Sequence, residues 1–137
     1  FFTERVLGPL SLASAHTTYP DAPSLCETAV LARLTSGTGQ QVSILATIGG
    51  AQPDRQEFTV KGTKTSRRVT DFHKDAISDG GDFIALREPP QDPRAISLKA
   101  QLDDLSLHLA AKPNRLATME EAFRIQTLVE SILAKTL

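Results

Sequence analysis

The chain has 137 residues, the size of one domain, and its fifteen Lys and Arg against sixteen Asp and Glu leave a net charge of -1. An apolar fraction of 40% and a charged fraction of 23% are typical of a folded globular protein rather than a disordered one. The sequence has neither a basic stripe to neutralise phosphates nor an apolar run long enough to cross a bilayer, so neither nucleic acid nor a membrane is expected as a partner.

The first part of the chain predicts strands joined by tight turns. Residues 10–18 alternate loosely between apolar and polar side chains. The runs 28–35 and 42–48 are apolar and partly β-branched, and Ser36-Gly37-Thr38-Gly39 lies between them. Since glycine supplies the positive φ that a tight connection needs, this pair of runs predicts a β-hairpin.

A second hairpin is predicted further along. Residues 57–61 and 66–72 flank the turn Gly62-Thr63-Lys64 in the same way. A last strand is expected at 82–88, ending at Pro89-Pro90 because proline cannot donate to a β-ladder. Hairpin connections dominate, so the sheet should be mostly antiparallel.

Beyond Pro93 the apolar period changes from two to about 3.6 residues, which predicts two helices. The first ends near Pro113 and carries one apolar stripe, made of Leu98, Leu102, Leu105 and Leu109. The second begins after Thr118, because Thr118 and Glu121 have the spacing of a capping box. Its buried face is expected to consist of Met119, Phe123, Gln126, Val129, Ile132 and Leu133.

Strands that precede helices without alternating with them indicate an α+β fold. We expect a mostly antiparallel sheet of five to six strands, with the two C-terminal helices covering one face. The strands 28–35 and 42–48 also carry apolar residues on the opposite face, including Leu31 and Leu45. The sequence therefore predicts a homo-oligomer that forms through this uncovered sheet face.

Few residues are candidates for chemistry. Gly37-Thr38-Gly39 does not match a dinucleotide-binding loop, because a third glycine and a following helix are missing. The three histidines, His16, His73 and His108, share no spacing typical of metal ligands, and Cys26 is the single cysteine. His16 and Tyr19, near the end of the first predicted strand, are the best candidates for lining a pocket, with an ordinary surface position as the alternative.

The remaining charged and thiol groups have simple structural interpretations. Asp103 and Asp104 are adjacent on one helix and point about 100° apart, so they predict a solvated face rather than a catalytic dyad. Arg67 and Arg68 alternate across a strand, and a weakly supported anion site remains open there. Cys26 has no basic neighbour and is expected to be a small packing residue. We assign no catalytic, cofactor-binding or metal-binding residue.

Three segments carry a resemblance to a known family: ETAVLARLTSGTGQQ at 27–41, EFTVKGTKTSRRV at 57–69 and NRLATMEEAFRIQTLVESIL at 114–133. In this order they resemble the C-terminal domain of the glucose–fructose oxidoreductase/inositol dehydrogenase family. The middle segment is similar to the family's Phe-x-Val-x-Gly-x-Lys-Gly-Ser pattern, with Thr65 at the position of the second glycine. The resemblance covers the chain from about Gly8 to Leu133.

This resemblance implies a NAD- or NADP-dependent oxidoreductase acting on a sugar or polyol. The family's N-terminal Rossmann domain, its catalytic Lys and its catalytic His lie in segments upstream of this chain. Residues 1–137 are then the substrate and oligomerisation domain of a cytoplasmic parent, inactive alone, binding no cofactor and contacting the parent's nucleotide-binding domain. The start at Phe1-Phe2 agrees with a piece of a longer protein. The alternative is a free-standing α+β module that dimerises or binds a small ligand.

Overall fold

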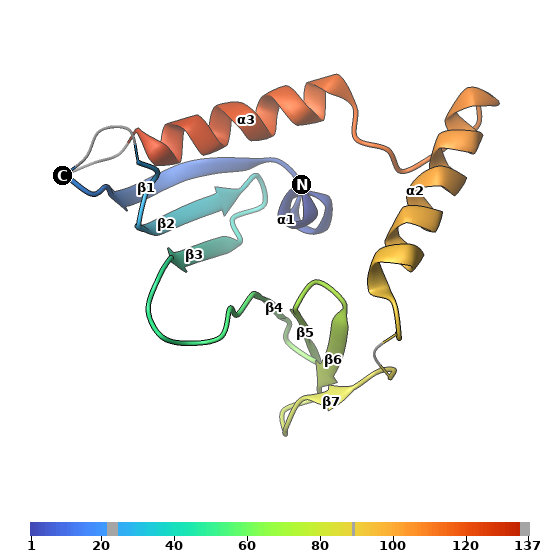
Figure 1. The fold of residues 1–137 in the computed structure, drawn as a ribbon, viewed down its shortest axis with the longest axis horizontal. Coiled ribbons are helices and arrows are strands. Elements are labelled where there is room, and N and C mark those ends of the chain that lie inside the picture. Colours follow the sequence, from blue (N-terminus) through green and yellow to red (C-terminus); the bar gives the residue numbers. More distant parts are fainter. Residues whose placement is uncertain (22–24, 89, 135–137) are drawn as a thin grey trace. The chain divides into compact units, whose positions relative to one another are not determined.

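The computed structural model describes residues 1–21, 25–88 and 90–134. Within these residues the chain forms two compact units, Phe1–Ala51 with Ala117–Leu137, and Gln52–Leu116. Each unit contains one antiparallel sheet (Figure 1). The α+β class and the antiparallel arrangement are therefore confirmed, while the described strands number seven and form two sheets rather than one.

The sheet of the first unit has the order β1-β2-β3. It consists of β1 (Leu10–Thr18), β2 (Ala29–Ser36) and β3 (Gln41–Thr47). β2 and β3 pair antiparallel, which confirms the predicted hairpin. The β1–β2 pairing shifts register between Leu12 and Ser14, a bulge that the sequence pattern did not indicate.

The hydrophobic core of the first unit lies between this sheet and α3 (Met119–Leu133), which runs along β1 (Figure 1). Its buried apolar side chains are Val30, Ala32, Leu34 and Ile132. Two hydroxyl groups, one in β1 and one just after it, donate hydrogen bonds to the last turn of α3. Thr17 Oγ1 donates to the carbonyl of Ile132 at 2.9 Å, and Tyr19 OH donates to that of Leu133 at 3.0 Å. Both carbonyls lie at a helix C-terminus, where intrahelical donors are missing.

The predicted buried face of α3 is confirmed only in the last turn, at Ile132 and Leu133, because Gln126 and Val129 are exposed. Met119 is 82% exposed and Phe123 is 76% exposed, whereas Leu128 packs against the core beside Ile132. Two apolar stripes satisfy the helical period in this segment, and the sequence alone does not choose between them. The ion pairs made by Glu121 and Arg124 to the helix α1 (Phe2–Leu7) select the stripe that is buried.

The sheet of the second unit has the order β4-β5-β6-β7. Its strands are β4 (Glu57–Lys61), β5 (Ser66–Thr70), β6 (Lys74–Ser78) and β7 (Ile84–Ala85). The predicted β4–β5 hairpin is confirmed. β6 was not predicted, because it starts with two charged residues. The strand expected at 82–88 is reduced to two residues, and Pro89, expected to end it, lies outside the described residues.

Gly62 has a steric role in the β4–β5 turn. A Cβ atom built at this position would lie 2.4 Å from the carbonyl oxygen of Thr65, closer than side-chain atoms approach backbone. A side chain at position 62 therefore requires the turn to move.

The helix of the second unit is α2 (Pro93–Leu109), with Asp92 as its N-cap. The Asp92 carboxylate accepts hydrogen bonds from the backbone N–H groups of Arg94 and Ala95. The predicted leucine stripe is present on α2, but its side chains are 42–79% exposed. They are Leu98, Leu102, Leu105 and Leu109. α3 thus packs on the first sheet, while α2, expected over the same sheet, belongs to the second unit.

Candidate functional site

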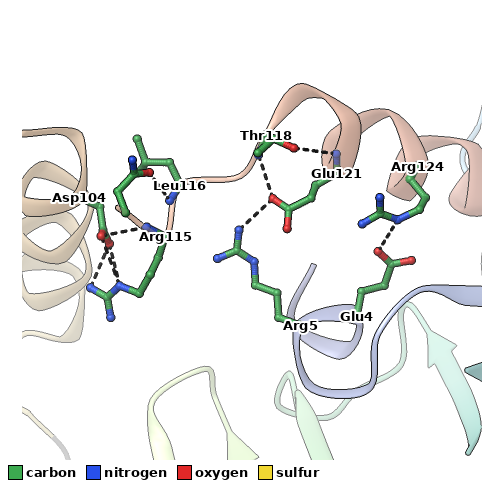
Figure 2. Close-up of polar contacts among 9 residues, drawn as sticks. Glu4, Arg5, Asp104, Arg115, Leu116, Thr118, Glu121 and Arg124 are labelled. Atoms are coloured by element: carbon green, nitrogen blue, oxygen red, sulfur yellow. Dashed lines mark hydrogen bonds and ion pairs between the residues drawn. The ribbon is translucent and has the colours of Figure 1, made fainter. Parts of the chain in front are cut away.

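Two ion pairs join α1 to α3 (Figure 2). Glu4 Oε2 lies 3.0 Å from Arg124 Nε, and Arg5 Nη2 lies 3.0 Å from Glu121 Oε2. The two pairs differ in burial. The Glu4 side chain is only 5% exposed and also accepts the N–H of Leu10 at 3.1 Å, whereas the Arg5 side chain is 39% exposed.

The carboxylate of Glu121 has a second role, at the start of α3. It accepts the backbone N–H of Thr118 at 2.9 Å, and the Thr118 hydroxyl accepts that of Glu121 at 3.2 Å, which confirms the predicted capping box (Figure 2). The hydrogen bond from the Thr118 backbone, followed by that from Arg5, lowers the pKa of Glu121. These contacts hold α1 against α3 and cap α3, so we assign the junction a structural role.

The second unit contains a cavity of about 550 Å³, a volume in the range of small-molecule sites. One wall is the turn between β5 and β6, formed by Asp71, Phe72 and His73. The other wall is one face of the first turns of α2, including Arg94, Leu98 and Gln101. These three are separated by four and three residues, a spacing that places them on one side of a helix.

Two polar side chains of this cavity are engaged by near neighbours in the chain. The Ser97 hydroxyl donates to the Pro93 carbonyl at 3.0 Å. Asp71 pairs with Lys74 at 2.7 Å. That hydrogen bond, with the positive charge of Lys74, lowers the pKa of Asp71.

The arginines considered as an anion site are engaged elsewhere. Arg67 lies 3.4 Å from Asp75, and Arg68 lies 3.4 Å from Glu57 with its guanidinium 3.8 Å above the ring of Phe83. A hydrogen bond from Arg55, then one from Thr59, lowers the pKa of Glu57. Each arginine therefore already has an acidic partner, on its own face of β5.

His16 and Tyr19 do not line the cavity. The Tyr19 hydroxyl is used in anchoring α3. His16 is half-buried on β1, opposite Leu31 in the ladder, and its Nδ1 atom is buried without a hydrogen-bond partner. Tyr19 thus supports α3, and neither residue belongs to the cavity between α2 and the β5–β6 turn.

The other sequence candidates are dispersed. His73 lines the cavity, whereas His108 lies at the exposed end of α2, 3.4 Å from Asn114. Asp103 is exposed and pairs with Lys99. Two predictions are wrong: Asp104 is buried and binds Arg115 at 3.0 Å, and Cys26 is exposed (Figure 2 shows the Asp104 contact).

The buried position of Asp104 follows from its partner. Its carboxylate accepts the backbone N–H of Arg115 at 3.1 Å and the guanidinium through Nε and Nη2. A solvated position was expected because a pair of acidic residues on a helix carries no signal of a partner located eleven positions further on.

Sequence reasoning missed the cavity residues Phe72, Arg94 and Gln101. Arg94 and Gln101 are seven positions apart, a spacing that places both on the same face of a helix and could have indicated a common site. Phe72 gave none, because the left-handed backbone that presents it is not indicated by a phenylalanine.

Across the described residues, no group of three or more His, Cys, Asp or Glu side chains is placed to hold a metal ion. Among the described helices, none combines the length and the apolar character that a membrane span requires. No protein-family model matches the chain, and the search of curated proteins finds no match.

Proposed function

We propose that residues 1–137 are the C-terminal domain of a NAD- or NADP-dependent oxidoreductase that acts on a sugar or polyol. In this role the chain supplies part of the substrate pocket wall and a subunit interface, and it is inactive alone. The observation that carries the proposal is the ordered set of three segments that resemble the glucose–fructose oxidoreductase/inositol dehydrogenase family.

Each of these segments forms a defined element of the fold. The segment 27–41 contains β2 and the turn into β3, and the segment 57–69 contains the β4–β5 hairpin. The segment 114–133 contains the capped helix α3. Gly62, which occupies the first glycine position of the family-like pattern, is required by the turn that it forms. Each segment therefore has a structural reason of its own: 27–41 and most of 114–133 belong to the first compact unit, and 57–69 belongs to the second.

The nicotinamide cofactor belongs, in this proposal, to a domain encoded upstream. A dinucleotide phosphate needs a glycine-rich turn that opens a helix. The turn containing Gly37 and Gly39 instead joins β2 to β3, so these residues do not fit the group. We therefore assign no step of hydride transfer to the side chains of this chain.

The outer face of the first sheet supports a role in subunit assembly. Leu31 is 55% exposed and Leu45 is 77% exposed, and the two are direct cross-strand partners. Their apolar surface becomes buried when a second copy covers the sheet. The same pair is what favours the second candidate, a free-standing dimerisation module.

Calorimetric titration distinguishes the two candidates. NADH and NADPH are titrated into the 137-residue chain and into the whole protein encoded by its reading frame. The proposal expects no binding by the chain and micromolar binding by the whole protein, which should also reduce the oxidised cofactor in the presence of one of a panel of sugars and polyols. Micromolar binding by the chain alone, or none by the whole protein, contradicts the proposal.

A further inference from the structure

The turn between β5 and β6 holds an aromatic side chain in an unfavourable backbone conformation. Asp71 and Phe72 have φ values of 50° and 64°. Aspartate tolerates this left-handed region, but phenylalanine disfavours it because its Cβ approaches the following carbonyl oxygen. The ring gains no burial in return, because Phe72 is 83% exposed. Strained residues of this kind are concentrated at ligand-binding and active sites.

The charges around the cavity favour an anion. Asp71 is neutralised by Lys74, with which it pairs at 2.7 Å. The nearby carboxylate of Asp92 caps α2 by accepting two backbone N–H groups and does not line the cavity. In the part of the chain that the structure describes, no carboxylate pairs with the Arg94 side chain. Among the residues that line the cavity, Arg94 is therefore a cation without a carboxylate partner.

The lining of the cavity combines polar and apolar groups, which selects a ligand shape. Arg94 and Gln101 project hydrogen-bond donors from one face of α2, and the residue between them, Leu98, is apolar and 56% exposed. Phe72 adds an aromatic ring from the turn. A ligand with a charged group at one end and a flat apolar face satisfies both kinds of surface at once.

We propose that this cavity binds a small organic anion, a carboxylate or phosphate carried on a compact body with an apolar face. Arg94 binds the anionic group, Gln101 donates a further hydrogen bond, and Phe72 and Leu98 contact the apolar face. The site uses no residue on which the proposed oxidoreductase role depends, so the two proposals stand or fall separately.

The test is a nuclear magnetic resonance titration of the isotopically labelled 137-residue chain. The probes are benzoate, phenyl phosphate, inorganic phosphate and uncharged benzyl alcohol. At least one charged ring compound should shift the amides of residues 71–73 and 93–101 in a saturable way. Inorganic phosphate should bind more weakly, and benzyl alcohol should not saturate. The tighter of benzoate and phenyl phosphate identifies the preferred anion.

Two variants and one control decide the assignment. Arg94→Gln should weaken binding at least about tenfold, since it removes a charge-assisted hydrogen bond. Lys112→Gln removes one positive charge from the segment just beyond the C-terminal end of α2 and should leave binding unchanged. Phe72→Asn should weaken binding and raise the melting temperature, because asparagine tolerates the left-handed region. If Phe72 has only a structural role, Phe72→Asn changes the melting temperature and leaves the binding affinity unchanged.

The proposal is wrong if neither charged ring compound gives saturable shifts at these amides. It is equally wrong if Arg94→Gln and Lys112→Gln weaken binding by the same factor. If inorganic phosphate binds as tightly as phenyl phosphate, the proposed contact of Phe72 and Leu98 with an apolar face of the ligand is wrong.

Discussion

The ion pair between Glu4 and Arg124 should contribute more to stability than its neighbour between Arg5 and Glu121. Glu4 is 5% exposed at its side chain, and its carboxylate oxygens are bound by Arg124 and by the N–H of Leu10. Breaking a fully buried pair costs about 3–5 kcal/mol, but the Arg124 side chain is 43% exposed and water partly replaces it. We therefore expect Arg124→Met to cost about 2 kcal/mol.

The matched control is Arg5→Met, which removes the same chemical group from the more exposed pair. Its effect should be clearly smaller, as is usual for ion pairs on a surface. Both variants keep an apolar side chain of similar length, so lost packing of the arginine stem is largely excluded as the cause. Urea unfolding followed by far-ultraviolet circular dichroism measures the free energies, and hydrogen exchange of the α3 amides locates the change.

A double variant separates the cost of leaving the Glu4 carboxylate buried without a partner from the cost of losing the Arg124 contact itself. Adding Glu4→Gln to Arg124→Met removes the charge that would be left buried, so the double variant should be more stable than Arg124→Met alone. Equal losses for Arg124→Met and Arg5→Met, or a double variant less stable than either single one, would refute the reasoning from burial.

Four further predictions follow from single features of the fold. Thr118→Ala should cost about 1 kcal/mol in urea unfolding, through loss of the capping box. Gly62→Ala should cost roughly 1–3 kcal/mol, because its Cβ would lie 2.4 Å from a carbonyl oxygen; an unchanged midpoint would show that the turn adapts freely. The pKa of Glu121 is lowered from 4.5 in the folded state, so its stabilisation is present above about pH 4.5 and is lost as the pH falls further; in Glu121→Gln this part of the acid dependence should disappear. Sedimentation of the chain at micromolar concentration should show a dimer or larger, and Leu31→Arg should dissociate it or make it insoluble; a native monomer would contradict the interface.

Local signals predicted the elements that depend on neighbouring residues. The strand at 10–18, both hairpins and the cap of α3 follow from turn glycines, apolar alternation and the Thr118–Glu121 spacing. Each of these patterns is read within a few residues of the chain. Propensity and periodicity are sufficient where the stabilising contacts are equally local.

The features that depend on distant partners were not predictable in the same way. The rotation of α3 is set by Glu4 and Arg5, more than a hundred positions earlier, as the pairs Glu4–Arg124 and Arg5–Glu121 show. The burial of Asp104 depends on a later arginine. β6 was missed because its charged residues are stabilised by pairing with β5 and not by a pattern of their own.

The cavity is the clearest example of this limit. Arg94 and Gln101 share a helix face that the sequence shows, but the opposite wall is the β5–β6 turn. That turn places Phe72 in a left-handed conformation that its residue type disfavours. From the sequence, a phenylalanine is expected to have a negative φ. The cavity wall that depends on the positive φ of Phe72 is therefore not predicted.

The coding DNA upstream of the Phe1 codon tests the central claim most directly. If the chain is the C-terminal domain of a nicotinamide-dependent oxidoreductase, the upstream sequence should encode, in frame, a strand, a Gly-x-Gly-x-x-Gly turn and a helix. A start codon a few positions upstream, with no such segment before it, would contradict the proposed function and leave a free-standing module.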